Sequence, residues 1–416
     1  MSEAAVGTSE RHASWLELFF DLVVVVAVAQ LAHLLHGGPG IGKVGLFVLL
    51  YYAVWSVWTS FTLYANVAGG RTRARSMLLA MFGIAVMAAS IPEVTHDRGA
   101  VFAIAYVVCK WLAMGTWRRT GTILTAWPAA QLGAGFVPWV ISIWVEPPAR
   151  YWLWAVGIAL EIGLSMAQGR NPAHLLAEAR AKEEFSERAR ITNAARKAQR
   201  GRPQRREREP LRLIPAVVDG SHLRERLGLF IIIVLGEAVA QVVGAAAEVE
   251  WSRALWFTAL AGFGLLVCLW WLALAYGSSA VPIGTRQTPP WLAIPAHFAM
   301  TLGITATAAG LGSMAEHPDG HMGTSMRWIL CGGMALYFAT LLATGVATKA
   351  PAQWIVGFSV PAVALPLLLG LAGGALPAWT LAVGLLAAAG WQAAYPKLAE
   401  RQAARLSGEV PPGELR

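Results

Sequence analysis

The sequence predicts an all-α, polytopic transmembrane helical bundle of about 12 spans in two six-helix halves. Hydrophobic residues make up 56% of the 416 residues and charged residues only 14%, which is typical of membrane proteins. Apolar runs of roughly 16 to 25 residues recur along the chain, close to the ~20 residues that cross a bilayer. One charged segment, 169–222, has six of these runs before it and six after it.

The expected spans follow directly from these apolar runs. The run 76–91 is short, and Pro361 and Pro366 interrupt the penultimate run, so the last pair could form broken helices or a re-entrant hairpin. Spans are predicted at 15–36, 44–66, 76–91, 100–117, 122–145, 151–168, 225–246, 252–276, 291–313, 326–348, 353–372 and 376–394.

Positive charge is concentrated between the two halves. Of the 33 Lys and Arg residues, 15 lie between Arg170 and Arg226, so the net charge of +9 indicates membrane orientation rather than a nucleic-acid partner. Both termini and this loop are predicted to be cytoplasmic. Asn171 as N-cap and Gly201 as stop predict an amphipathic cytoplasmic helix, followed by a linker.

Four regions follow from these boundaries. They are the transmembrane halves 1–168 and 223–396, the basic helix and linker 169–222, and a cytoplasmic tail 397–416. The acidic start MSEAAVGTSE does not resemble a signal peptide, so none is expected.

Several classes of site lack their sequence signature. The three cysteines lie in apolar runs without metal-ligand spacing, and the glycine-rich stretches lack the strand and helix context of a phosphate loop. The loop EHPDGH at 316–321 carries metal-capable side chains, but Pro318 and Gly320 break any helix there. We therefore expect no cofactor and no metal.

Three stretches resemble one known family. ELFFDLVVVVAVAQLAHLL at 17–35, RERLGLFIIIVLGEAV at 224–239 and IPAHFAMTLGITATAAGL at 294–311 are similar to the bacterial low-temperature-requirement A (LtrA) membrane proteins. The resemblance implies a multi-pass protein of the bacterial cytoplasmic membrane, in a family named after a cold-growth phenotype. The valine-rich first helix and the basic central loop depart from the family pattern.

Acidic residues inside apolar runs are the main candidates for chemistry. An ionised group costs on the order of 2.5–3.5 kcal/mol at the centre of a bilayer, so it needs a partner, a cavity or a neutral state. Asp21 and Glu237 have no obvious deep partner, and together with Glu17 they are candidate proton carriers or general acids. Alternatively, Glu17 and Asp21 form boundary salt bridges with Arg224 or Arg226.

Other polar and aromatic residues complete the predicted site. Lys110 and Glu161 lie about ten residues into their spans, and their opposite charges predict a buried structural pair. The tryptophans could line a cavity that stabilises a cation, or they could face lipid. The candidate substrate-binding residues are Gln30, His33, Arg226, Gln241, His297, Trp55, Trp58, Trp270 and Trp271.

Three functions remain compatible with this pattern. The first is a transporter in which intramembrane carboxylates carry protons coupled to a small solute. The second is a membrane enzyme that uses a carboxylic acid on a lipophilic, isoprenoid-like substrate, as in a protonation-initiated terpene cyclase. The third is a non-catalytic envelope or cold-stress scaffold. Membrane lipid and a small or lipophilic molecule are the expected partners, and nucleic acid is not. Whether Asp21 and Glu237 share a cavity separates these possibilities.

Overall fold

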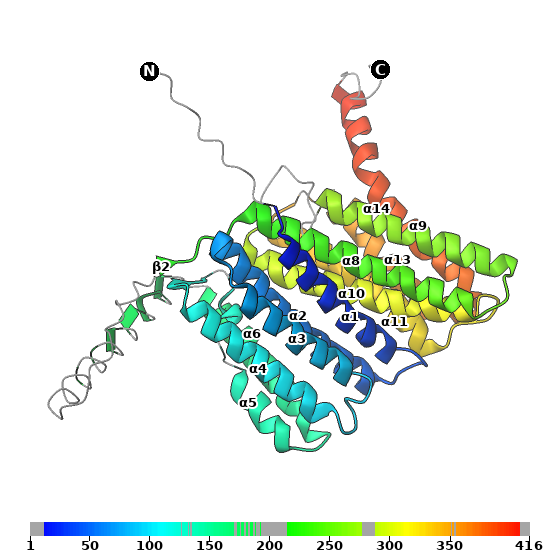
Figure 1. Ribbon diagram of the computed structural model, residues 1–416. Helices are drawn as coiled ribbons and strands as arrows, with labels where there is room; N and C mark the ends of the chain where they lie inside the picture. Colours follow the sequence, from blue (N-terminus) through cyan, green and yellow to red (C-terminus); the bar gives the residue numbers. More distant parts are fainter. Residues whose placement is uncertain are drawn as a thin grey trace. The chain divides into compact units, whose positions relative to one another are not determined.

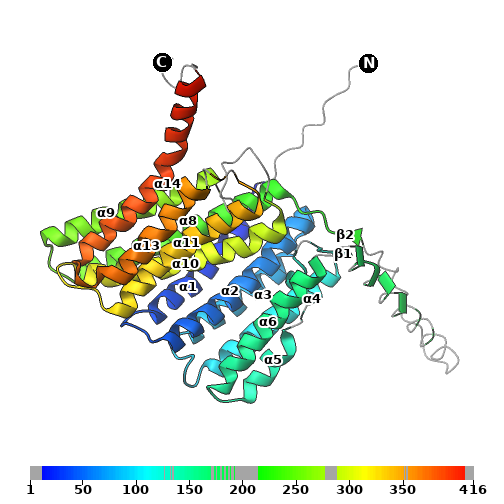
Figure 2. The same ribbon diagram turned by 180° about the vertical axis from the view of Figure 1, so that it is seen from behind.

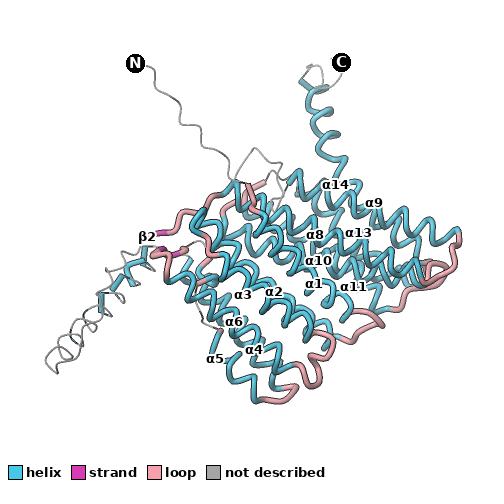
Figure 3. Tube along the Cα trace, in the orientation of Figure 1, coloured by secondary structure: helices cyan, strands magenta, loops and turns pink. Residues whose placement is uncertain are grey.

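The computed structural model describes residues 12–125, 127–131, 133, 135–169, 214–276, 288–350 and 355–407, with isolated positions between 173 and 192 and at 352. Helices dominate this part of the chain, and the strands β1 (Thr122–Ile123) and β2 (Ile214–Pro215) form one short parallel pair, shown in Figure 3. The contacts group into two compact units: one contains 14–20 and 53–223, and the other contains 21–52 and 224–416. The unit borders therefore fall inside helices.

The first unit is a set of packed antiparallel helices. Neighbouring helices along the chain contact each other, and Trp139 and Trp154 stack in its core with ring centroids 5.0 Å apart. Its elements are α3 (Ala74–Ser90), α4 (Gly99–Arg118), η2 (Pro128–Ala130), α5 (Phe136–Ile141), η3 (Ser142–Trp144) and α6 (Ala149–Gly169), together with the first part of α1 (Trp15–Leu34), most of α2 (Ile41–Ala68) and the start of α8 (Gly220–Ala247).

The second unit contains the long helices of the C-terminal part of the chain, which run side by side in Figures 1 and 2. Small residues allow two of them to approach closely, since a side chain at Gly303 or Gly333 would collide with the facing backbone. The elements are α9 (Arg253–Tyr276), α10 (Pro290–Glu316), α11 (Thr324–Ala347), η4 (Ile355–Ser359), α13 (Val360–Ala372), η5 (Gly373–Ala375) and α14 (Ala378–Ser407).

Among the described residues, eight helices are long and apolar enough to cross a membrane. They are α1, α2 extended to Arg71, α4, α8, α9 to Leu274, α10, α11 and the segment Ile355–Ala375. The chain is thus an all-α polytopic protein, whereas the expectation of 12 spans is not met. Helices α3, α6 and α14 form where spans were predicted, although they are not among these eight.

The predicted span 122–145 is wrong. The chain there forms β1, the 3-10 turn η2, the six-residue helix α5 and the turn η3 instead of one helix. Pro128 and Pro138 lack a backbone N–H, and Gly133 and Gly135 weaken helix formation, so the apolar run cannot continue as one helix. The ends of the predicted cytoplasmic helix, Asn171 and Gly201, lie outside the described residues.

Candidate functional site

The first deep acidic residue, Glu17, is held by the start of its own helix. Ser14 donates from its backbone nitrogen (2.8 Å) and from its hydroxyl (2.7 Å) to Glu17 Oε2. The Glu17 nitrogen donates weakly back to Ser14 Oγ at 3.4 Å, which completes a capping box at the N-terminus of α1. The other carboxylate oxygen, Oε1, lies 3.5 Å from His222 Nε2 on α8, and both side chains are buried.

His222 in turn is held by Asn66 and by the residue that caps α8. The Asn66 side chain donates from Nδ2 to the Asp219 carbonyl (2.9 Å) and accepts from the Asp219 nitrogen at Oδ1 (2.9 Å). Asp219 Oδ1 accepts from the nitrogens of Ser221 (3.0 Å) and His222 (3.1 Å), as an N-cap does. These hydrogen bonds, led by that from the Ser221 hydroxyl, lower the pKa of Asp219.

These contacts define the tautomer of His222. Asn66 Nδ2 also lies 3.1 Å from His222 Nδ1. Because Asn66 Oδ1 accepts from the Asp219 N–H, Nδ2 is the donor end of the amide, so His222 Nδ1 must accept. The proton of a neutral His222 is therefore on Nε2, where it faces Glu17. All of these residues belong to the first unit.

The second deep acidic residue, Asp21, forms an ion pair. Arg226 Nη2 donates to Asp21 Oδ1 at 2.6 Å, and both side chains are fully buried. The sequence offered Arg224 or Arg226 as salt-bridge partners for Glu17 and Asp21. The structure shows this pairing for Asp21 with Arg226, whereas Glu17 lies beside His222. The Asp21–Arg226 pair belongs to the second unit.

The third carboxylate, Glu161, lies with Lys110 in the first unit. Lys110 Nζ is 2.8 Å from Glu161 Oε1, and both side chains are more than nine-tenths buried. Tyr106 donates to Glu161 Oε2 at 3.1 Å, and Lys110 also donates to the Ala129 carbonyl at 3.3 Å. The pair therefore carries the extra hydrogen bonds that a buried ion pair requires.

Glu237 differs from the other three. It is half-buried on α8, and Gln241 Nε2 donates to its Oε1 at 2.7 Å. The same Gln241 nitrogen lies 3.5 Å from His33 Nε2 at the end of α1, and the His33 ring meets the His36 ring edge-on at 5.0 Å. We call Glu237, Gln241, His33 and His36 the polar row. Burial, and secondarily the charge of His33, lowers the pKa of His36, while Glu316 opposes the shift.

The two acidic residues proposed as one site are not brought together. Glu237 lies eleven positions after Arg226, the partner of Asp21, on α8. At ~1.5 Å per residue, this is a distance of about 16 Å along the helix axis. Asp21 is fully buried in its ion pair, whereas Glu237 is half-exposed beside a neutral amide.

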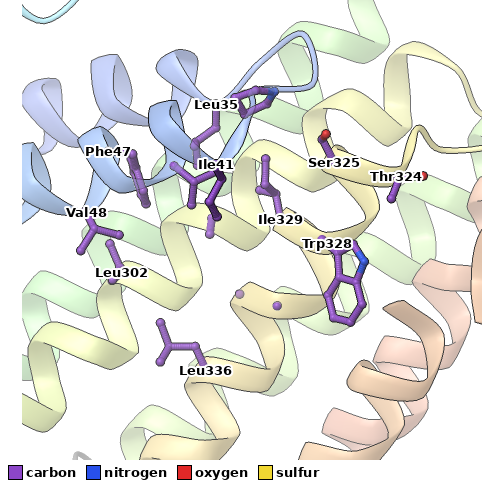
Figure 4. Close-up of a pocket in the computed structure, with 15 residues that line it drawn as sticks. Leu35, Ile41, Phe47, Val48, Leu302, Thr324, Ser325, Trp328, Ile329 and Leu336 are labelled. Atoms are coloured by element: carbon purple, nitrogen blue, oxygen red, sulfur yellow. The ribbon is translucent and has the colours of Figure 1, made fainter. Parts of the chain in front are cut away.

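A cavity of about 420 Å³ lies in the second unit, between the α1–α2 turn and helices α10 and α11 (Figure 4). Leu302 and Leu336 lie at one end and Trp328 at another, while Thr324 and Ser325 supply hydroxyl groups. No lining residue is acidic or basic. Leu35, which lines the cavity, lies between His33 and His36 in the sequence.

The remaining predicted residues are dispersed. His297 is fully buried and its Nε2 donates to the Leu227 carbonyl at 3.2 Å, so it links α10 to α8. Trp270 and Trp271 are about two-fifths exposed on α9. Trp55 and Trp58 are buried in the first unit, and Gln30 is half-buried on α1.

Two residues of the site were missed from the sequence, His222 and Asn66. The seventh span was predicted to begin at 225, which left His222 outside the membrane segment. A signal was present, because His222 and Arg226 are four residues apart, as are Glu17 and Asp21. Nothing in the sequence near Asn66 indicated that α2 would contact the start of α8.

Apolar helices that enclose acidic side chains and their basic partners define a polytopic, helical integral membrane protein. The chain belongs to the bacterial low temperature requirement A protein (LtrA) family, whose sequence model matches residues 12–389. It is similar to the uncharacterized protein RA0937 of Rhizobium meliloti (strain 1021), with 27% identity over 421 residues that cover 95% of this chain and 93% of that protein. No solved structure matches the chain.

Proposed function

We propose that this LtrA-family protein is a proton-linked carrier and that Glu237 is the group that takes up and releases the proton. One contrast carries the proposal. Glu17, Asp21 and Glu161 each lie beside a basic side chain, whereas the hydrogen bond recorded for Glu237 among the described residues comes from the neutral amide of Gln241.

The free energy needed to protonate a carboxylate differs between one that is paired with a basic side chain and one that is bound by a neutral amide. A proton added to Asp21 would leave Arg226 buried without its counter-charge, which is strongly unfavourable. A proton added to Glu237 leaves only an amide hydrogen bond to rearrange. Glu237 is also only partly buried, whereas Asp21 is fully buried. Asp21 and Glu17 are therefore assigned to holding α1 against α8.

The polar row extends from Glu237 to the end of α1, with Gln241 between Glu237 and His33 and with His36 beyond the helix end. An amide nitrogen donates hydrogen bonds but does not accept a proton, so Gln241 orients Glu237 and His33 and does not pass the proton between them. We place the proton exchange at Glu237 itself. In the proposed topology, with both termini cytoplasmic, this end of α1 faces away from the cytoplasm.

The proposed solute is apolar or amphiphilic. The cavity in the second unit is lined almost entirely by aliphatic and aromatic side chains, with hydroxyls only from Thr324 and Ser325. A terpene cyclase is less well supported, because its cavity must hold an acid next to the substrate and this one has none among its lining residues. The ion pairs Asp21–Arg226 and Lys110–Glu161, and the contact of Glu17 with His222, support a scaffold as the second candidate.

The proposal is tested by infrared spectroscopy of the protein in lipid vesicles, titrated with pH. In pH-difference spectra we expect one protonated-carboxyl band of the wild type to be absent from Glu237→Gln and present in Asp21→Asn. Identical difference spectra for wild type and Glu237→Gln would overturn the assignment. Growth at low temperature of a bacterium lacking its own LtrA gene gives a second comparison of the same variants.

A further inference from the structure

The cavity of the second unit is open along its side as well as at its end. Most of its lining comes from α2, α10 and α11, each of which is long and apolar enough to span a membrane. Ile41, at the start of α2, is 89% exposed, and Val48, Trp328 and Leu336, further along the helices, are each 36% exposed. The cavity is therefore a groove that hydrocarbon chains of the bilayer can enter from the side.

The groove extends along α11 for about the depth of one bilayer leaflet. Figure 4 shows Thr324 and Ser325 toward one end of the groove and Leu336 toward the other. Thr324 and Leu336 are twelve positions apart on α11, which is about 18 Å at ~1.5 Å per residue. One leaflet contributes about half of the ~30 Å hydrocarbon thickness, or roughly 15 Å. An acyl chain of that leaflet therefore has a length similar to that of the groove.

The chemistry of the wall differs between the two ends. Thr324 and Ser325 are exposed in the first turn of α11, and all other lining residues are aliphatic, aromatic, glycine or proline. A polar solute would lose hydrogen bonds to water against such a wall, whereas an acyl chain has none to lose. The two hydroxyl groups can donate to the ester carbonyl oxygens at the head of a lipid chain.

A basic residue lies beside the polar end of the groove. Lys43 is exposed in the first turn of α2, between Ile41 and Val44, which both line the groove. In the part of the chain that the structure describes, no carboxylate forms an ion pair with Lys43. Glu316, at the end of α10, interacts electrostatically with His36. The Lys43 ammonium group is therefore available to the phosphate of a lipid.

We propose that the groove binds a phosphoglyceride of the surrounding bilayer, with one acyl chain between α2, α10 and α11 and with the phosphate beside Lys43. The proposal names the chemical class of the amphiphilic solute and rests on that part of the proposed function. Glu237 does not line the groove, so lipid binding requires no proton exchange at this residue.

The test compares two lipids that share their acyl chains, phosphatidylglycerol and diacylglycerol. Each is titrated into the full chain in detergent, and native mass spectrometry measures the bound fraction. Gly332→Phe fills the groove, since a Cβ there meets no atom within 4 Å, and should weaken binding of both lipids by roughly tenfold. Lys43→Gln should weaken binding of phosphatidylglycerol alone, by roughly fivefold.

Two variants outside the groove serve as matched controls and should bind both lipids as the wild type does. Gly390→Phe alters a half-buried glycine of α14 that also has no atom within 4 Å of an added Cβ. Arg253→Gln removes an exposed positive charge from the first turn of α9, in the same unit as Lys43.

Phosphatidylglycerol binding to Gly332→Phe at the wild-type level would place the chain elsewhere and overturn the proposal. A preference for phosphatidylglycerol over diacylglycerol that persists in Lys43→Gln would overturn the position of the phosphate. Glu237→Gln should bind both lipids as the wild type does. If proton exchange also persists in Glu237→Gln, the carrier assignment fails while the lipid site stands.

Discussion

At the scale of single residues, the orientation of the Asn66 amide decides which ring nitrogen of the buried His222 accepts a hydrogen bond. Asn66 is bound on both ends by the backbone of Asp219, so it cannot turn to accept from His222 without losing two hydrogen bonds. The other ring nitrogen, Nε2, lies 3.5 Å from Glu17 Oε1. Three helices, α1, α2 and α8, are joined by this chain of contacts in the first unit.

Nitrogen-15 NMR measures the tautomer directly. In the wild type we expect the Nδ1 signal of His222, assigned by comparison with His222→Gln, to be that of a ring nitrogen that accepts a hydrogen bond. Asn66→Asp replaces the donor with an acceptor, so Nδ1 should change from hydrogen-bond acceptor to donor. A wild-type ring protonated on Nδ1 would contradict the assignment, and the signal of the exposed His33 serves as an internal control.

The cap of α8 predicts a pH dependence. The pKa of Asp219 lies below its usual value of 3.8, chiefly through the hydrogen bond from the Ser221 hydroxyl. Its stabilisation of the helix start is therefore complete above pH 3.8 and is lost as pH falls through the lowered pKa. The Tm advantage of wild type over Asp219→Asn should shrink over that range. A difference that does not change with pH would contradict this.

At the scale of elements, the sequence predicts most helices because apolar length and flanking charge determine them. The start of α1 is a further case, since Ser14 and Glu17 form a capping box that can be recognised from the sequence alone. The run 122–145 is apolar and long enough to be predicted as a span, but Pro128 and Pro138 prevent one continuous helix. The contacts of Asn66 were unpredictable, because they depend on where α2 ends relative to α8.

The Lys110–Glu161 pair links α4 to α6 and can be tested as a pair. Lys110→Met alone should destabilise the protein by about 3–5 kcal/mol, because it leaves a buried carboxylate without its counter-charge. Adding Glu161→Leu should recover most of that loss. Unfolding by denaturant in micelles measures both, and a double variant as unstable as Lys110→Met would show that the pair is not the cause.

The cavity between α1–α2 and α10–α11 can be filled with little disturbance. Gly332 lines it, and a Cβ added there meets no atom within 4 Å. Gly332→Phe should weaken binding of a fluorescent alkyl-chain probe by roughly tenfold, or ~1.4 kcal/mol. Gly163→Phe, at an exposed glycine of α6 with equal space, is the control. Equal binding by both variants would place the probe elsewhere.

At the scale of the whole molecule, the chain is a polytopic helical membrane protein of the LtrA family, and the function proposed for it depends on which carboxylate exchanges protons. The sequence identified the deep acidic residues and offered Arg226 for Asp21 and Lys110 for Glu161, but it did not indicate His222 as the neighbour of Glu17. Only the packed helices distinguish Asp21, which faces Arg226, from Glu237, which faces Gln241. Pairing across elements depends on three-dimensional packing, which helix periodicity does not determine.

The most direct test is the internal pH of vesicles that contain the purified protein and a pH-sensitive dye, followed after a shift of the external pH. We predict faster equilibration with wild type and with Asp21→Asn than with Glu237→Gln, which should match protein-free vesicles. Equal rates for wild type and Glu237→Gln would contradict the assignment of Glu237 as the proton carrier.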